Sequence, residues 1–580
     1  MNKIIIYQLL PRLFGNTCNS CIPDGSIEQN GVGKFDDINE QALNAIKDLG
    51  ATHVWYTGVI EHATQTDYTK FGISKDNPHI VKGKAGSPYA IKDYYDVDPD
   101  LAVNIANRMS EFESLIERTH KADLKVLIDF VPNHVARQYH SDAKPRGIED
   151  LGANDNTDFY FHPNNNFYYI PRQLFSPSID LGSGSEAYYE FPAKATGNDC
   201  FSAFPNQNDW YETIKLNYGI DYGDKSNHFD PIPNTWFKML NILRFWASKG
   251  IDGFRCDMAH MVPIAFWKWA IPQVKGKYQD IIFIAEIYDV NLYRDYLYNG
   301  HFDYLYDKVN LYDTLRNIQC NNNSAARLTN CWQTIDGIGD SMLNFIENHD
   351  EQRFASRFFA GNASLVLPSL VVSSTINRGP FMIYSGQEIG EEGTDTEGFS
   401  GNDGRTTIFD YWSIATIRRW YNNGLCNNEN LTFKEINLRN LYKNVLHICN
   451  SEKAITNGLF YDLMYVNYNN EDFHPHKQFA YLRVYETNIL LIAVNFGEES
   501  DNIKINIPSH AFEFLKIEQG VYKATDLLSD STATINFDCN IPFSTEIKAS
   551  GAVIWKLTKE RNKVSRKKTT NNNSSPNKKL

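Results

Sequence analysis

Long apolar runs are absent from this chain of 580 residues. No stretch reaches the roughly 18 consecutive apolar residues that a membrane-spanning helix needs, so we expect no membrane insertion. The opening segment, MNKIIIYQLLPRLFG, resembles a signal peptide, but Tyr7 and Gln8 interrupt its apolar run and no cleavage pattern of small residues follows. We therefore interpret it as a buried strand and expect a cytoplasmic protein, or a periplasmic or secreted one if a signal was removed.

Cysteines are few and scattered. The nine cysteines are an odd number spread between positions 18 and 539, which does not resemble a disulfide framework. A reducing compartment is the simplest interpretation. Cys18 and Cys21 form a single CxxC pair, and a zinc site needs four ligands, so we expect no metal or redox function there.

Basic residues are outnumbered, with 56 Lys and Arg against 70 Asp and Glu, which gives a net charge of −14. Residues 559–580 hold eight basic groups and one acidic group, so the rest of the chain carries 48 against 69, or −21. A body this acidic argues against nucleic acid or an anionic membrane as the main partner. The 35 Phe, 33 Tyr and 10 Trp exceed what a core needs and indicate a surface that stacks on flat partners such as sugars, nucleobases or other aromatics.

Eight short apolar runs have the length and composition of buried parallel strands, and amphipathic segments lie between them. Alternating strands and helices over this length predict a parallel sheet, and eight units predict a closed (β/α)8 TIM barrel. The expected strands are 4–10, 53–58, 125–131, 251–255, 281–287, 302–306, 342–347 and 380–385. The clearest expected helices are 38–49, 109–122, 235–248 and 354–375.

Two parts of the chain break this alternation. Residues 135–234, rich in Asn, Gly, Pro and aromatics, are too long for a loop after a barrel strand, so we expect a small irregular domain inserted between strand 3 and helix 3. Residues 425–557 contain short alternating strands separated by turn residues, which predict an antiparallel β-sandwich. The barrel then comprises 1–134 and 235–424, and the basic tail 558–580 is expected to be disordered.

Charged or imidazole side chains directly follow four of the expected barrel strands. They end the segments DFVPNH (129–134), GFRCD (253–257), IAE (284–286) and ENHD (347–350). Because the active site of such a barrel lies at the C-terminal ends of its strands, we expect these side chains to meet. A single buried charge would normally be a structural salt bridge, but four at one rim favour a catalytic site.

Glycosidic bond cleavage fits this set, since it needs one carboxylate as nucleophile and one carboxylic acid to protonate the leaving oxygen. Arg255 lies two residues before Asp257 on the same strand face, where it can hold that carboxylate ionised and orient it. The apolar neighbours of Glu286 favour its protonated form. Asp350 can stabilise developing positive charge and bind sugar hydroxyls.

These segments resemble the signature regions of the α-amylase family, glycoside hydrolase family 13. DFVPNH is similar to its region at strand 3, GFRCD to its nucleophile strand, IAEI to its acid/base strand and IENHD to the strand of its transition-state Asp. The opening IYQLLPRLF and the segment from Gly379 to Glu388 resemble its first and eighth strands. The resemblance covers nearly all of residues 3–557. It implies a retaining double displacement through an α-glucosyl enzyme intermediate.

The resemblance also implies residue roles. Asp257 corresponds to the nucleophile, Glu286 to the acid/base, Asp350 to the transition-state stabiliser and Arg255 to the support of the nucleophile. In GSPYAIKDYY, Tyr89 stands where the family stacks an aromatic ring on the sugar at the cleavage point. The other residues that we expect to bind the substrate are His134, His349, His260 and Arg353.

A calcium site is implied by the same resemblance. Asn133 matches the family's usual calcium-ligand Asn, and a second ligand is the backbone carbonyl four residues past the nucleophile, here that of Met261. Asp155 or Asp158 could complete the oxygen shell, so we expect Ca²⁺ here. The alternative is that Asn133 only hydrogen-bonds its loop.

Two departures from the family concern specificity. α-Amylases often carry Lys-His three and four residues after the nucleophile, where this sequence has His260 and Met261. The inserted-domain motif KLNYG (215–219) matches neither the α-amylase nor the α-1,6-glucosidase pattern. Fine specificity therefore does not transfer from the resemblance.

Three functions follow as alternatives. The first is a monomeric hydrolase of α-glucosidic, mainly α-1,4, bonds in starch-type glucans or maltooligosaccharides. The second is a transglycosylase, a glucan-rearranging enzyme or an α-1,6-active hydrolase on the same scaffold. The third, an inactive homologue that serves as a binding protein, predicts the loss of a carboxylate, and all three carboxylates are present.

Overall fold

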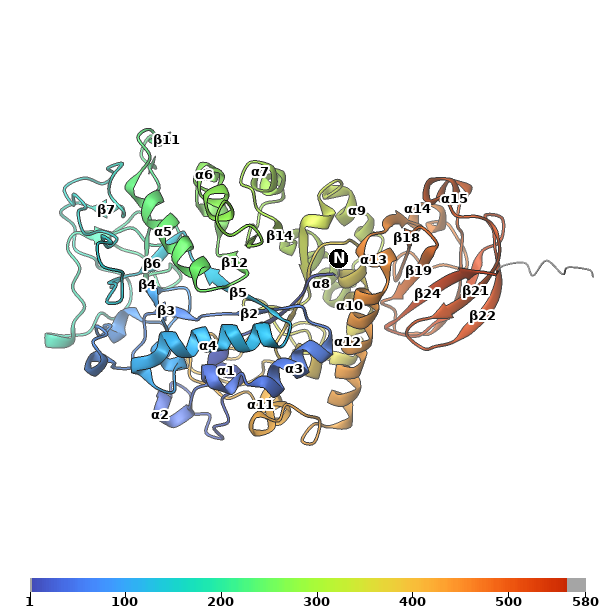
Figure 1. The fold of residues 1–580 in the computed structure, drawn as a ribbon, viewed down its shortest axis with the longest axis horizontal. Helices are drawn as coiled ribbons and strands as arrows, with labels where there is room; N and C mark the ends of the chain where they lie inside the picture. The colour runs from blue at the N-terminus through green and yellow to red at the C-terminus, as the bar shows by residue number, and fades with distance from the viewer. Residues whose placement is uncertain (1–2, 561–580) are drawn as a thin grey trace, which may run out of the picture.

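Eight parallel strands close into a barrel at the centre of the molecule (Figure 1). In the computed structural model, which describes residues 3–560, each strand pairs with the next around the ring, and the last pairs with the first. The predicted TIM barrel is therefore confirmed. In ring order the strands are β1 (Ile5–Leu9), β2 (His53–Tyr56), β5 (Lys125–Phe130), β12 (Gly253–Cys256), β13 (Ile282–Ala285), β14 (Tyr304–Tyr306), β15 (Met342–Phe345) and β16 (Phe381–Tyr384).

The strands are largely apolar because both of their faces are covered, one by the barrel interior and one by the surrounding helices. Three helices match their prediction within two residues: α3 (Glu40–Leu49), α4 (Arg108–Lys121) and α5 (Asn234–Ser248). The helix predicted for 354–375 is shorter, because turns and the 3₁₀ turn η11 (Ala363–Val366) precede α10 (Leu367–Thr375). The side chain of Asn362 accepts a hydrogen bond from the backbone N–H of Ser364. This bond caps the start of the 3₁₀ turn, so the turn is not continuous with the residues before it.

A small domain of turns and two- or three-residue strands is inserted between β5 and α5, at one end of the molecule in Figure 1. Its antiparallel pairs are β6 (His134–Ala136) with β9 (Thr213–Lys215), β7 (Tyr169–Ile170) with β8 (Ala193–Lys194), and β10 (Ile220–Asp221) with β11 (Ser226–Asn227). Such short pairs cannot form a sheet of their own, so the domain depends on the barrel beside it.

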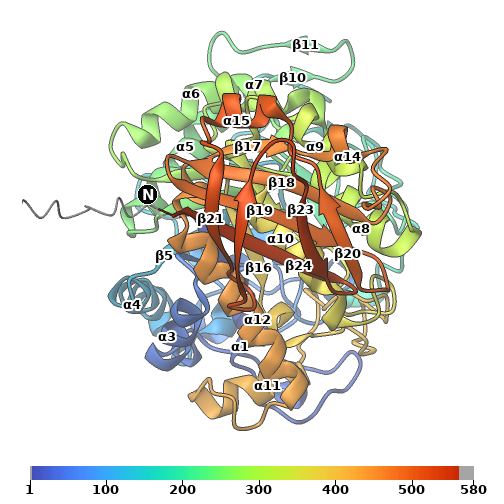
Figure 2. The same ribbon diagram turned by 90° about the vertical axis from the view of Figure 1, so that its right-hand side faces the viewer.

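The C-terminal domain is an antiparallel sandwich at the opposite end of the molecule in Figure 1, and Figure 2 shows it facing the viewer. A two-stranded sheet, β20 (Asp501–Ile505) and β23 (Phe543–Ile547), packs through β23 on the middle of a six-stranded sheet. In order, the larger sheet contains β17 (Leu459–Asp462), β18 (Gln478–Tyr485), β19 (Asn488–Asn495), β24 (Gly551–Lys559), β21 (Gly520–Asp526) and β22 (Thr532–Phe537).

Both boundaries of the C-terminal domain differ from their prediction. The helix α12 (Phe433–Ser451) packs on α3 and α10, and Arg439 forms a 2.8 Å ion pair with Glu388 beyond β16. We therefore place the end of the barrel unit after residue 451. At the other end, Thr558 and Lys559 belong to β24, where they pair with β21. The rest of the expected tail, 561–580, lies outside the described residues.

None of the helices within residues 3–560 combines the length and the apolar character that crossing a bilayer requires.

Candidate active site

Arg255 on β12 is the centre of a buried group of carboxylates. Its Nη1 lies 2.8 Å from Asp257 Oδ1 and 3.4 Å from Asp129 Oδ1, and its Nη2 lies 2.8 Å from Glu286 Oε2. Its Nε donates a hydrogen bond of 3.3 Å to Tyr306 OH. Because β5, β12 and β13 are neighbours in the barrel, one guanidinium orients carboxylates that follow or end three adjacent strands.

The charges in this group favour the retention of a proton. Burial raises the pKa of Asp257 well above its ordinary value; Arg255 opposes this shift, and Glu286 and Asp129 reinforce it. Burial likewise raises the pKa of Asp129 to about 6. Three carboxylates around one guanidinium cannot all ionise without cost. The coupled carboxylates can therefore keep one proton between them near neutral pH.

The apolar surroundings predicted for Glu286 were wrong. Its Oε1 accepts a 2.6 Å hydrogen bond from Tyr288 OH, and its Oε2 accepts one of 2.8 Å from the backbone N–H of Met258 in addition to the ion pair with Arg255. Side chains alternate along a strand, so the apolar residues next to Glu286 in sequence do not share its surroundings. Both carboxylate oxygens of Glu286 are thus held in fixed positions.

His349 links the fourth carboxylate to this group. Its Nε2 lies 3.2 Å from Asp350 Oδ2 and contacts Tyr89 OH, while its ring stacks on Tyr89 at 5.3 Å between centroids. The other ring nitrogen lies 2.7 Å from Gln8 Nε2, which fixes the orientation of the ring. Burial, followed by the charge of Arg255, lowers the pKa of His349 to about 3, so the imidazole is neutral. The side chain of Asp350 is 40% exposed and is accessible to a substrate.

Two further predicted substrate-binding histidines lie beside the catalytic group. His260 is partly exposed, with Nδ1 3.5 Å from the backbone carbonyl of Glu286. His134 is buried at the start of the inserted domain, where its ring lies 5.2 Å from that of Trp210. Burial, followed by the charge of Lys215, lowers the pKa of His134 to about 3, so this imidazole is also neutral.

Arg353 does not reach the catalytic group. The prediction that it binds substrate was therefore wrong. Its side chain is 1% exposed, and its Nη1 lies 3.1 Å from Glu347 Oε2. Its Nε donates to Thr406 Oγ1 at 2.8 Å, and its guanidinium lies 3.8 Å from the ring centroid of Tyr384. All of these partners belong to the protein, so Arg353 has a structural role.

A cavity of about 550 Å³ lies between the inserted domain and the loop after β12, and two residues of its wall, Met258 and His260, contact Glu286. Aromatic rings and polar atoms share its wall, a mixture that suits the faces and hydroxyls of a sugar. The lining residues are Asn198, Asp199, Trp210, Ile220, Tyr222, Met258, His260, Met261, Val262, Pro263 and Tyr296.

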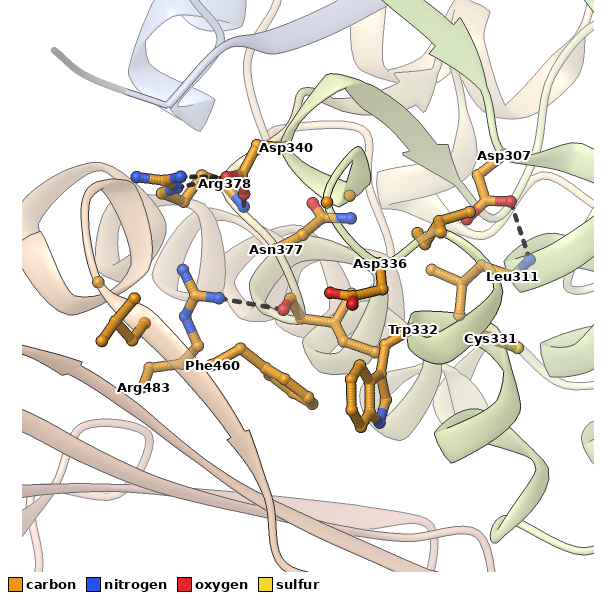
Figure 3. A pocket seen from close by; sticks show the side chains of 16 residues that line it. Asp307, Leu311, Cys331, Trp332, Asp336, Asp340, Asn377, Arg378, Phe460 and Arg483 are labelled. Atoms are coloured by element: carbon orange, nitrogen blue, oxygen red, sulfur yellow. Dashed lines mark hydrogen bonds and ion pairs between the residues drawn. The ribbon is translucent and has the colours of Figure 1, made fainter. Parts of the chain in front are cut away.

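A separate cavity of about 410 Å³ lies between the barrel wall and the C-terminal domain (Figure 3). Trp332 and Phe460 face each other in it, with 5.7 Å between their ring centroids. Asp340 accepts a 2.7 Å hydrogen bond from Arg378 Nε, and Arg483 donates to three backbone carbonyls. Asp340 precedes β15, so this part of the cavity is at the barrel end opposite the catalytic group.

The predicted calcium ligands do not form one oxygen shell. Asn133 Oδ1 and the carbonyl of Met261 both face Lys215 Nζ, at 2.5 and 3.4 Å. Asp155 accepts hydrogen bonds from two backbone N–H groups and one tyrosine hydroxyl of its own loop, and Asp158 is exposed. A lysine ammonium contacts the oxygens assigned to the metal, so these residues do not fit a calcium ion.

Four contributors to the site escaped the sequence analysis as functional residues: Asp129, Tyr288, Gln8 and Lys215. Asp129 ends an apolar strand and Tyr288 lies two residues after Glu286, so both had a positional signal. Gln8 lies on β1 and contacts His349 from 341 residues away, a pairing that only the closed barrel reveals. Lys215 lies in the KLNYG motif, which differs from the two family patterns, but the motif alone did not indicate what this lysine contacts.

Comparison with known proteins agrees with this arrangement. The family model of the α-amylase catalytic domain matches residues 8–419. The chain is 24% identical over 390 residues to alpha-amylase 3 of Dictyoglomus thermophilum, which covers 64% of this chain and 68% of that protein. It is 23% identical over 440 residues to an alpha-glucosidase of Apis mellifera, covering 67% and 63% of the two chains. Of alpha-amylase MalA from Haloarcula japonica, 23% identical, the chain spans 44%.

A solved structure extends the agreement to the whole fold. The α-amylase of Geobacillus thermoleovorans superimposes with a TM-score of 0.63 at 18% identity, over 96% of this chain and 99% of that chain. This likeness includes the inserted and C-terminal domains. The family model covers most of the sequence, including the barrel residues Asp257, Glu286 and Asp350. The chain therefore belongs to the α-amylase family of glycoside hydrolases.

Proposed function

We propose that this protein is a retaining hydrolase of α-glucosidic, mainly α-1,4, bonds in starch-type glucans or maltooligosaccharides. The observation that carries the proposal is the fork of Arg255, which contacts Asp257 and Glu286 at 2.8 Å each. A nucleophile and an acid held by one guanidinium face the same small volume. Retaining enzymes place their two carboxyl groups about 5–5.5 Å apart, as such a volume permits.

In the first step, a carboxylate oxygen of Asp257 attacks the anomeric carbon of the sugar. Glu286 gives its proton to the glycosidic oxygen, the glycosidic bond breaks, and the leaving sugar departs with a hydroxyl group. The product of this step is a glycosyl ester on Asp257. Arg255 stabilises the ionised state of Asp257 before attack, and Asp350 stabilises the positive charge that develops on the sugar.

In the second step, Glu286 is a carboxylate and removes a proton from water. The resulting oxygen nucleophile attacks the anomeric carbon from the side that the first sugar left, and the ester bond to Asp257 breaks. Two inversions give net retention, so the released sugar is the α-anomer. Tyr288 OH and the backbone N–H of Met258 hold Glu286 in place through both steps.

A second candidate is transglycosylation on the same scaffold, including glucan rearrangement or α-1,6 activity. The 550 Å³ cavity supports it, because Trp210 and Tyr222 offer rings on which an acceptor sugar could stack, and Met258 and His260 of its wall contact Glu286. Product analysis on starch, maltotriose, pullulan, isomaltose and cyclodextrin, with and without an added acceptor sugar, separates the two candidates. Longer or new linkages that rise with acceptor concentration favour transfer.

The proposed hydrolysis is tested by NMR of the first product formed from maltooligosaccharide. The α-anomer should appear first and then equilibrate to the mixture. A β-anomer as the first product would contradict the double displacement. The Asp257→Asn variant, which cannot form the ester, is the control for background hydrolysis.

A further inference from the structure

Lys215 is a buried cation at the junction of the inserted domain and the barrel. It ends β9, and its side chain is 2% exposed. Its Nζ lies 2.5 Å from Asn133 Oδ1, 2.6 Å from Asp199 Oδ1 and 3.4 Å from the carbonyl oxygen of Met261. An ammonium group has three N–H donors and no acceptor, so three oxygens match its capacity.

The three oxygens come from three different parts of the fold. Asn133 follows the barrel strand β5, Asp199 lies in the inserted domain, and Met261 lies in the loop after β12, four residues beyond Asp257. The Nδ2 of Asn133 donates a 2.8 Å hydrogen bond to the carbonyl of Gly197, which leaves its Oδ1 directed at the ammonium. The set of a carboxylate, an amide oxygen and a backbone carbonyl is one that hard metal cations also use.

A calcium ion does not fit beside this lysine. Calcium takes six to eight oxygen ligands, often including several carboxylates, whereas within residues 3–560 one carboxylate, that of Asp199, contacts Lys215. A divalent ion together with Lys215 would place three positive charges next to one negative charge. The lysine cannot move aside easily, because its side chain is 2% exposed and closely surrounded.

We propose that Lys215 is a built-in cation that takes the place of a metal ion and joins the inserted domain to the barrel and to the loop after the nucleophile. The junction then needs no divalent metal. A covalently attached ammonium has an advantage over a bound ion, because it is not lost by dilution or chelation. Lys215 positions the loop that carries His260 and Met261, and it does not contact the reacting carboxylates.

Melting temperature in calcium and in chelator tests this proposal independently of the glycosidase assignment. The wild-type protein should melt at the same temperature in about 10 mM calcium chloride and in EDTA. The Lys215→Ala variant removes the ammonium and leaves three oxygens around a space that one calcium ion and water can fill. Its melting temperature should fall by several degrees in EDTA and recover partly in calcium, by linkage to ion binding.

Two control variants make the comparison specific. In Lys215→Ala/Asp199→Asn, the calcium response should disappear because the carboxylate is gone. Lys523→Met, at an exposed position of β21, removes a surface lysine and should behave as the wild type in both buffers.

The proposal would be overturned if calcium changed the melting temperature of the wild type and of Lys215→Ala by the same amount, or changed neither. If Lys215→Ala does not fold, the wild type decides alone. A melting temperature unchanged by EDTA then supports the built-in cation, and a loss of several degrees that calcium restores rejects it.

Discussion

The Asp129→Asn variant should change how the stability of this protein depends on pH. Asp129 is 4% exposed, and burial raises its pKa from 3.8 to about 6, although Arg255 and Trp55 oppose the shift. Between these two values, the unfolded chain has an ionised carboxylate while the folded protein still holds the proton. The folded state therefore binds more protons, and stability falls as pH rises from about 4 to about 6.

The size of this effect follows from the shift. A difference of about two pKa units corresponds to ~3 kcal/mol of stability lost between pH 4 and pH 6.5. Asparagine does not ionise, so the variant does not incur this loss. Unfolding entropy for a chain of 580 residues is about 1.2 kcal/mol/K. The melting temperature of Asp129→Asn should therefore rise relative to the wild type by about 2–3 °C over that pH range.

Differential scanning fluorimetry of both proteins at half-unit pH steps measures this difference, and other titrating groups cancel in it. Asp307→Asn is the matched control, since Asp307 is 1% exposed, also has a pKa raised by burial to about 6, and has no contact with Arg255. Both variants should show the same pH-dependent gain. Only Asp129→Asn should lose activity, by about 10- to 100-fold in kcat, because Arg255 loses the negative charge of a partner that fixes its position. A difference in melting temperature between the wild type and Asp129→Asn that stays constant from pH 4 to pH 6.5 would refute the reasoning.

Other changes test the site and the fold. Asp257→Asn should lower kcat by several orders of magnitude in a protein that still folds, and residual activity within about tenfold of the wild type would reject Asp257 as the nucleophile. Tyr288→Phe should lower kcat about tenfold, since Glu286 loses a 2.6 Å hydrogen bond; equal kcat values in a steady-state assay would contradict this. Arg353→Met should lower the melting temperature by about 3 °C, because it leaves the buried carboxylate of Glu347 without its ion-pair partner. A loss of substrate affinity with an unchanged melting temperature would argue for a binding role. Removing 561–580, which contain few apolar residues, should leave activity and melting temperature nearly unchanged; a loss of several degrees in the truncated protein would show that the tail docks.

The barrel could be predicted because its signals are local. Each strand is a short, largely apolar run, since both faces of a parallel strand are buried, and Asp257 and Glu286 stand directly after such runs. The strand ends of β12 and β13 therefore gave Arg255, Asp257 and Glu286 without any knowledge of the fold. The order of the strands followed from the rule that consecutive βα units lie next to each other.

The domain boundary near residue 424 was less predictable because helices look alike in sequence. The apolar face of α12 fits a barrel as well as a sandwich, and only its packing on α3 and α10 assigns it to the barrel. The role of Arg353 was also hard to predict from the sequence. Its partner Glu347 is six residues away, but whether a buried arginine faces a carboxylate or a cleft depends on the turn between them.

The calcium prediction shows why a motif transfers single residues better than it transfers a site. Asn133 matches the family position and still points its amide oxygen at a cation, as the resemblance implies. What decides the identity of that cation lies 82 residues later, where Lys215 extends its side chain into the same space. A nucleophile needs one neighbour to be in place, and Arg255 is two residues from Asp257. An ion site needs its whole shell, and here one lysine brings a charge of +1 that lies 2.6 Å from the carboxylate of Asp199. The sequence contained this exchange in KLNYG, but its meaning required the folded arrangement of β5, β9 and the loop after β12.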